Sequence, residues 1–212
     1  MSKEIITQNR VEQGSLDSKC HKSPLASTRR KKRFYQRAVS GVTAGKHRNE
    51  FIAFLTLTSS LESPADITHS WEKLKKRIRR RYGNFEYIWV RERTQSGLVH
   101  MHILFRGPYI PQDWISKNWE EIHKAKIVYV EAVWDTGKAI RYMMKYLSKE
   151  MEGRFGYSWK WIFKGAAQVW KWLCRALRYE MKEIIKIWEK LIIEIPPEGI
   201  RWGRIWELVG YG

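Results

Sequence analysis

Two β-rich runs that lie close together, residues 85–93 and 99–106, constrain the fold of this chain more than any other feature. The residues between them, 94–98, form a connection of hairpin length that contains Gly97. Glycine accepts the backbone conformations that such short connections need. We therefore expect the two runs to pair as antiparallel neighbours in one sheet.

This hairpin lies inside a regular series of elements. Residues 51–58 are apolar on both faces, which suits a strand in the middle of a sheet, and apolar residues recur at helical spacing over residues 67–82. A second helix begins at Pro111, a fourth strand covers residues 126–134, and a third helix covers residues 135–149. The predicted order is therefore β-α-β-β-α-β-α.

That order predicts an α+β fold of the split-βαβ kind, with an antiparallel sheet of ferredoxin-like or RRM-like topology and helices on one side. We expect this sheet domain to cover residues 49–152 and to leave one sheet face free for chemistry. Residues 153–212 are rich in Trp and keep helical spacing, so they predict a C-terminal helical region that packs on the sheet or forms an oligomer interface. Residues 1–48 carry the basic run 29–33, and we expect a mobile basic arm that contacts DNA or aids solubility.

Charge indicates the class of partner. The chain has 40 Lys and Arg residues against 22 Asp and Glu residues, a formal net charge of +18, and 12 Trp and 10 Tyr residues that could stack on bases. The cations are spread along the whole chain, which favours a nucleic acid over a membrane surface. Two cysteines and no apolar stretch of membrane-spanning length predict a soluble, cytoplasmic protein without disulfides or a membrane partner.

His100-Met101-His102 lies in the second strand of the hairpin, where alternation puts both imidazoles on one face. Counting back across the five-residue connection places Glu92 opposite His100 on that face. Glu86 has the same parity but lies too far along the hairpin. Two imidazoles and one carboxylate predict a site for one divalent ion, for which Mn²⁺ or Mg²⁺ suits best and Zn²⁺, Fe²⁺ or Co²⁺ is also acceptable.

The third helix carries two Tyr-x-x-Lys repeats. Tyr142 and Tyr146 share one face, and Lys145 and Lys149 share another, because each pair is four residues apart. One interpretation is an amphipathic helix with buried rings and lysines that reach the solvent. Met143 begins a separate apolar stripe, which leaves the tyrosines available for chemistry. A phenol that attacks phosphorus forms a phosphotyrosine diester, which conserves the cleaved bond for later rejoining.

Three ordered motifs within residues 50–150 resemble those of HUH endonucleases, in particular rolling-circle replication initiators (Rep) with two tyrosines. The resemblance implies that His100, His102 and Glu92 hold one divalent ion and that a tyrosine of the following helix cuts DNA. The motifs are Phe54-Leu55-Thr56-Leu57-Thr58, Glu92-x-x-Gln95-x-Gly97-x-x-His100-Met101-His102 and Tyr142-x-x-Lys145-Tyr146-x-x-Lys149.

By this resemblance the protein is a plasmid or viral initiator that nicks single-stranded or hairpin origin DNA. It would stay joined to the 5′ phosphate, release a 3′-OH primer and later rejoin strands. Tyr146 matches the position used by single-tyrosine relatives, so it is preferred over Tyr142 as nucleophile, with Lys145 and Lys149 assisting. The chain has no G-x-x-x-x-G-K-S/T loop, so helicase and polymerase are expected from a prokaryotic host.

Two other functions stay open at this point. An HUH single-strand transposase uses the same chemistry but is typically smaller and has one tyrosine. A non-enzymatic RRM-like binding module needs stacking aromatics on its central strands, where this chain has His100 and His102. Further DNA contacts are predicted for five side chains: Thr56, Thr58, Arg91, Arg93 and Arg106.

Overall fold

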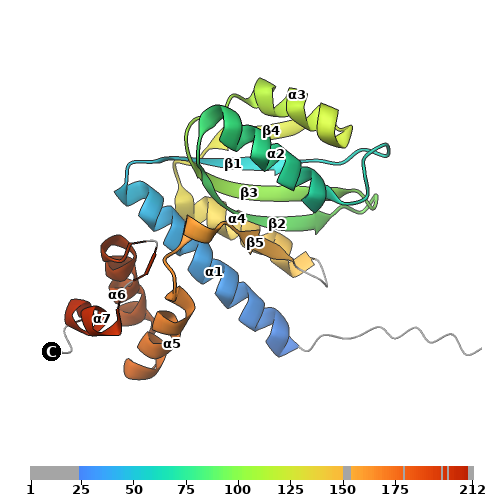
Figure 1. The fold of residues 1–212 in the computed structure, drawn as a ribbon. Coiled ribbons are helices and arrows are strands. Elements are labelled where there is room, and N and C mark those ends of the chain that lie inside the picture. Colours follow the sequence, from blue (N-terminus) through green and yellow to red (C-terminus); the bar gives the residue numbers. More distant parts are fainter. Residues whose placement is uncertain (1–23, 150–153, 179, 197, 200, 210–212) are drawn as a thin grey trace, which may run out of the picture.

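The computed structural model describes residues 24–149, 154–178, 180–196, 198–199 and 201–209. It has one five-stranded sheet with helices on both sides (Figure 1). The predicted α+β class is confirmed. The elements are α1 (Pro24–His47), β1 (Phe51–Leu57), α2 (Ile67–Tyr82), β2 (Glu86–Arg93), β3 (Val99–Gly107), α3 (Gln112–His123), β4 (Val128–Ala132), α4 (Thr136–Lys149), β5 (Phe155–Tyr157), the 3₁₀ turn η1 (Trp159–Trp161), α5 (Ala166–Ala176), α6 (Met181–Glu194) and α7 (Trp202–Val209).

The strand order is β4-β1-β3-β2-β5, and every neighbouring pair is antiparallel. The first four strands have the split-βαβ order, and β5 adds a fifth strand beside β2. β1 lies between two neighbours, as expected for a strand that is apolar on both faces. The β2–β3 register pairs Glu92 with His100 and Arg93 with Val99, as predicted from the length of the connection. Gly97 supplies the positive φ of that connection, +85°.

One face of the sheet forms an apolar core with α2 and α3. Met101, Ile103 and Phe105 alternate along β3 toward this side and are fully or almost fully buried against Trp71 of α2 and Trp119 of α3. Each aliphatic side chain buried to this degree contributes about 1.5–3 kcal/mol of transfer free energy. This core fixes the strands whose other face carries the polar site.

The opposite face is covered by α1 and α4, which differs from the expected free face and mobile N-terminal arm. Phe34, Ala38 and Val42 recur every fourth residue along α1 and are buried against the sheet. Residues 24–47 are therefore a packed helix, while residues 1–23 lie outside the described part of the chain. The apolar stripe was hidden in the sequence because one member is Ala and cations surround it.

The segment after α4 returns to the sheet. Ser158 accepts a hydrogen bond from the backbone N–H of Tyr87 at 2.9 Å, and the indole of Trp161 donates to the carbonyl of Arg37 at 2.8 Å. Trp161 is fully buried against α1, where a Cβ on Gly41 would overlap its ring. Residues 155–161 thus pack with the sheet, beyond the predicted boundary at 152.

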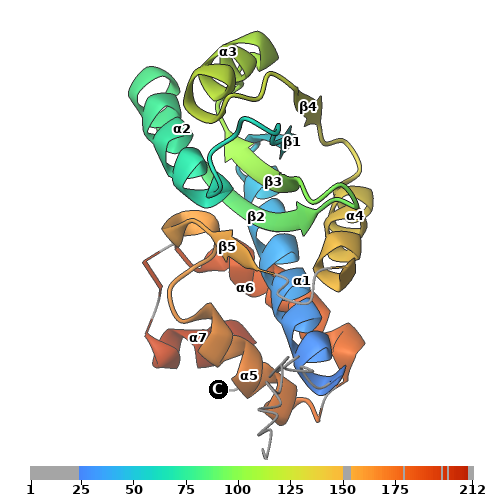
Figure 2. The same ribbon diagram turned by 90° about the vertical axis from the view of Figure 1, so that its right-hand side faces the viewer.

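The C-terminal region is helical, as predicted, and has its own apolar cluster. α5, α6 and α7 gather around Leu173, Trp188 and Leu191 below the sheet, as Figures 1 and 2 show. The indole of Trp188 donates to Ser40 Oγ of α1 at 2.8 Å, which connects this cluster to the sheet through α1. Among the described residues, no helix has the length and apolar character needed to cross a membrane.

Candidate metal and nucleophile site

Glu92, His100 and His102 meet on the α4 side of the sheet, next to the β2–β3 connection (Figure 2). One ligand atom from each residue lies within 4.8 Å of the ligand atoms of the other two. Two strands achieve this because His100 and His102 alternate onto one face and Glu92 is the cross-strand partner of His100. The sequence prediction of the three-residue cluster agrees with this geometry.

His102 is held from three sides. Its Nε2 lies 3.1 Å from Oε2 of Glu92, its Nδ1 lies 3.1 Å from Oγ1 of Thr56, and its ring stacks on Phe54 at 5.9 Å between centroids. When Nδ1 carries the proton and donates it to Thr56, the lone pair of Nε2 is directed at the cluster. The arrangement therefore fixes the tautomer that a metal ligand needs.

Burial sets the charge state of the cluster. Glu92 is 8% exposed and His102 is 3% exposed, so the ligand set is largely shielded from water. Burial lowers the pKa of His100, and the nearby negative charge of Glu92 opposes this shift only in part. A lowered pKa favours the neutral imidazole at neutral pH, which is the form that binds a metal ion. Two imidazoles and one carboxylate fit a single divalent cation.

Tyr142 of α4 lies beside this cluster. Its ring centroid is 6.0 Å from that of His102 and 5.4 Å from that of Phe54, with edge-to-face geometry in both pairs. The residue is 45% exposed, so a strand of DNA could reach it from the solvent. Lys145 is also exposed on α4. The side chains of Tyr146 and Lys149 lie outside the described part of the molecule, so the preference for Tyr146 stays a prediction.

The two threonines predicted to contact DNA bind protein groups instead. Thr56 Oγ1 is the partner of the His102 imidazole, and Thr58 Oγ1 donates to the carbonyl of Ile127 at 2.7 Å. Thr56 therefore acts on the cluster through His102. This role was missed because it depends on the β1–β3 register, in which Thr56 is the direct partner of His102.

The three predicted DNA-binding arginines also lie away from the cluster. Arg91 reaches Thr68 at the start of α2, 3.5 Å away, on the opposite face of the sheet. Arg93 is exposed and donates to the carbonyl of Gly97 at 2.8 Å. Arg106 is 1% exposed, and its guanidinium binds the Glu50 carboxylate. The prediction of a DNA contact for Arg106 is wrong, because α1 and η1 cover this end of β3.

The edge strand β4 contributes two residues that the sequence analysis did not single out. Tyr129 is the register partner of Thr56, is about half exposed, and donates its hydroxyl to Glu131 at 3.1 Å. This hydrogen bond is the main cause that raises the pKa of Tyr129, and nearby Tyr142 adds a smaller effect in the same direction. Alternation along β4 is the signal that would have found both.

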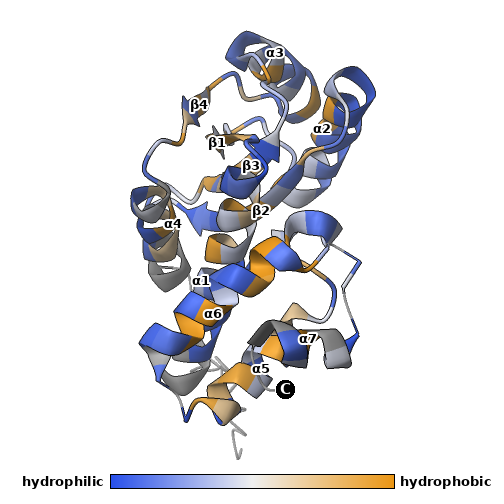
Figure 3. Ribbon diagram, turned by 90° about the vertical axis from the view of Figure 1, so that its left-hand side faces the viewer, coloured by the Kyte–Doolittle hydropathy of each residue, from blue (hydrophilic) through white to orange (hydrophobic). Residues whose placement is uncertain are grey.

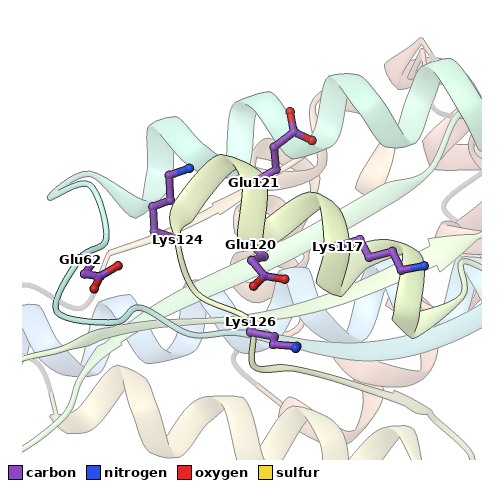
Figure 4. A pocket seen from close by; sticks show the side chains of 6 residues that line it. All are labelled: Glu62, Lys117, Glu120, Glu121, Lys124 and Lys126. Carbon is purple, nitrogen blue, oxygen red and sulfur yellow. The ribbon is translucent and has the colours of Figure 1, made fainter.

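A charged hollow on α3 has no part in this site (Figure 4). It lies over the sheet face opposite the ligand cluster, and the carboxylate of one lining residue, Glu121, already binds Arg77 at 2.6 Å. Its lining mixes both signs of charge: Glu62, Lys117, Glu120, Glu121, Lys124 and Lys126.

Residues 52–151 match the family model of the replication-associated protein ORF2. This segment is a replication-associated domain of the rolling-circle type. It contains the whole ligand cluster and both tyrosines. The chain is also similar to a solved structure, that of the hypothetical protein ORF119 from Sulfolobus islandicus rod-shaped virus 1. The identity is 18% and the TM-score 0.39, over 50% of this chain and 90% of that one. No curated protein matches the chain.

Proposed function

We propose that this protein starts rolling-circle replication of a plasmid or a virus by nicking and rejoining single-stranded origin DNA at the Glu92–His100–His102 cluster. The observation that carries the proposal is the position of Tyr142, whose ring lies 6.0 Å from that of His102 within the segment that matches the replication-associated family. A nucleophile and a metal-ligand set on neighbouring elements are what metal-assisted phosphoryl transfer requires.

Glu92, His100 and His102 would hold one divalent ion, with Mn²⁺ or Mg²⁺ as the first choice for phosphate chemistry. When bound, such an ion supplies positive charge that polarises the scissile phosphate. Thr56 keeps Nε2 of His102 directed at the cluster, and Phe54 holds the ring in plane. The protein thus provides a rigid ligand set on paired strands.

The phenol oxygen of Tyr142 or Tyr146 attacks the phosphorus of the scissile phosphate. A new Tyr–O–P bond forms as the P–O3′ bond breaks, and the departing 3′ oxygen takes up a proton to give a free 3′-OH. A phenol with a pKa of about 10 is mostly protonated at neutral pH, so nearby cations must favour its ionisation. Lys145 is exposed on the same helix and can hold a phosphate oxygen. Attack of a 3′-OH on the phosphotyrosine reverses the step and rejoins the strand.

Formation of a covalent adduct tests this proposal. Purified protein with Mn²⁺ is incubated with a labelled library of random-sequence single-stranded oligonucleotides, denatured and separated on a gel. We expect a labelled protein band that EDTA abolishes. Tyr142→Phe and Tyr146→Phe are each expected to weaken the band, and the double variant to lose it.

The same gel separates the alternatives. Adduct formation by the double variant would contradict the tyrosine assignment. DNA binding without any adduct would favour the non-enzymatic alternative, a binding module of RRM-like fold. Unwinding and extension are then expected to come from the helicase and the polymerase of the host, since a free 3′-OH is all that the nick itself supplies.

A further inference from the structure

The outward side of α2 carries a dense group of cations that the cutting site does not use. Its centre is a stripe of Lys73, Lys76 and Arg80, which lie about one turn apart and point away from the buried face of Ile67, Trp71, Leu74 and Ile78. Arg79 and Arg81 flank the stripe, and all five cations are exposed. We call these five residues the α2 cationic face.

The acidic residues around α2 are engaged by other groups. Glu72 binds Lys75 at 2.5 Å, Glu121 of α3 binds Arg77 through both guanidinium nitrogens, and Asp66 caps the start of the helix at Thr68 N. Their charge is therefore directed at Lys75, Arg77 and the helix end. α6 differs, because its exposed Lys182, Lys186 and Lys190 are interspersed with Glu183, Glu189 and Glu194.

The α2 cationic face lies on the other side of the sheet from the ligand cluster. α2 and α3 cover one face, whereas Glu92, His100 and His102 lie on the face that α1 and α4 cover (Figures 1 and 2). Hydrophilic residues occupy much of α2 in Figure 3. A strand held at Tyr142 is thus separated from these cations by the thickness of the sheet.

The two sides also differ in their aromatic residues. Tyr129 and Tyr142 are about half exposed beside the ligand cluster, and such rings can stack on unpaired bases. On α2, Trp71 is fully buried and Tyr82 packs edge-on against Trp114. A side that presents cations, with its rings turned inward, suits the phosphates of a duplex, whose bases are already stacked.

We propose that the α2 cationic face binds the phosphate backbone of duplex DNA, as a second DNA site separate from the cutting site. The stripe from Lys73 to Arg80 extends over about 10 Å at 1.5 Å per residue, enough to meet several phosphates along one strand. The inference takes from the proposed function only that the polyanion is DNA. It predicts that duplex binding and single-strand cutting depend on different residues.

The test compares two triple variants that remove the same charge. Lys73→Gln/Lys76→Gln/Arg80→Gln changes α2, and Lys182→Gln/Lys186→Gln/Lys190→Gln is the matched control on α6. Binding to a labelled duplex is measured in EDTA at several salt concentrations. We expect the α2 variant to lose about tenfold or more in affinity and to lower the salt slope by about 3, one for each phosphate contact. The α6 variant should stay within about twofold of the unchanged protein.

Further measurements keep the outcome decisive. The charge-conserving variant Lys73→Arg/Lys76→Arg/Arg80→Lys should retain duplex binding, and adduct formation on a short single-stranded oligonucleotide should be the same in all variants. Equal losses in the α2 and α6 variants, or unchanged duplex binding in the α2 variant, would overturn the inference. So would displacement of the duplex DNA by duplex RNA at lower concentration than by unlabelled DNA. Failure of adduct formation in every variant would overturn the proposed cutting function and leave the duplex result to be judged by itself.

Discussion

The two faces of one sheet serve different ends in this protein. On β3, Met101, Ile103 and Phe105 point into the core under α2 and α3, whereas His100 and His102 point to the side of α1 and α4. On this second side α1 covers Leu104 further along the strand, and the polar cluster lies at the hairpin end. Alternation thus lets one strand supply stability on one side and chemistry on the other, and the two should be separable by mutation.

The largest effect is expected from removing a metal ligand. His100→Ala should lower adduct formation by about three orders of magnitude, because a bound metal ion stabilises several kcal/mol of charge in phosphoryl transfer. The free energy of unfolding of the metal-free protein should change by less than about 1 kcal/mol, since His100 is partly exposed. His47→Ala is the control. Unchanged adduct formation in His100→Ala would contradict the assignment of the cluster.

A substitution on the other side of the same strand should have the reverse effect. Ile103→Ala is expected to lower the free energy of unfolding by about 2–5 kcal/mol, because Ile103 is fully buried and leaves a cavity. Urea unfolding measures the loss. Leu61→Ala, at a residue that is 93% exposed, should stay within about 0.5 kcal/mol. If both variants behaved alike, the core assigned to this face would be wrong.

A smaller effect is expected where a neighbouring strand orients a ligand. Thr56→Val keeps the shape of the side chain but removes the hydroxyl that meets Nδ1 of His102 at 3.1 Å. Loss of such a partner typically costs about 10–100-fold in metal affinity. Calorimetry with Mn²⁺ should detect this loss, Thr56→Ser should restore most of the affinity, and Thr43→Val on α1 serves as the control. Equal affinity in Thr56→Val and Thr43→Val would exclude the orienting role.

The smallest effect concerns pH, and it involves a histidine on each side of the sheet. Burial lowers the pKa of His123, although Asp66 opposes the shift, and the pKa of His100 is lowered in the same way. The unfolded chain then binds more protons than the folded protein below the ordinary histidine pKa of about 6.5. Stability should therefore be retained above this pH and fall as the pH decreases through it.

Urea unfolding in EDTA at pH 7.5 and at pH 5.5 measures this dependence. His123 is held by Ser59 and Ser70, each at 2.9 Å, so His123→Gln should be less stable at both pH values but should show a smaller difference between them. His69→Gln, at an exposed position, should keep the full difference. An unchanged difference in His123→Gln would remove this histidine from the explanation.

Local rules predicted the parts of the site that depend on neighbouring residues. The alternation of His100 and His102 and the length of the 94–98 connection fixed the position of Glu92, because a hairpin register follows from its turn. The match of Thr56 to His102 depends on pairing between strands far apart in the chain. No local pattern encodes that pairing, so Thr56 was predicted to contact DNA.

The parts that failed are those that depend on long-range packing. α1 was predicted to be a mobile arm because Ala38 and Gly41 gave a weak apolar signal, yet these small residues are what let the helix approach Trp161. β5 has three residues, too few to show a period. Arg106 was assigned to DNA from its charge, and its burial follows from the helix that covers it.

The addition of β5 to the sheet has a consequence for the helix that carries the nucleophiles. β4 precedes α4 at one edge of the sheet, and β5 follows it at the opposite edge. α4 is thus tethered at both ends and cannot swing away as a hinged flap unless β5 separates from β2 or β4 from β1. During strand exchange the tyrosines stay in place while the DNA ends enter and leave, so the turnover of the enzyme depends on how fast the nucleic acid can be threaded past a stationary helix.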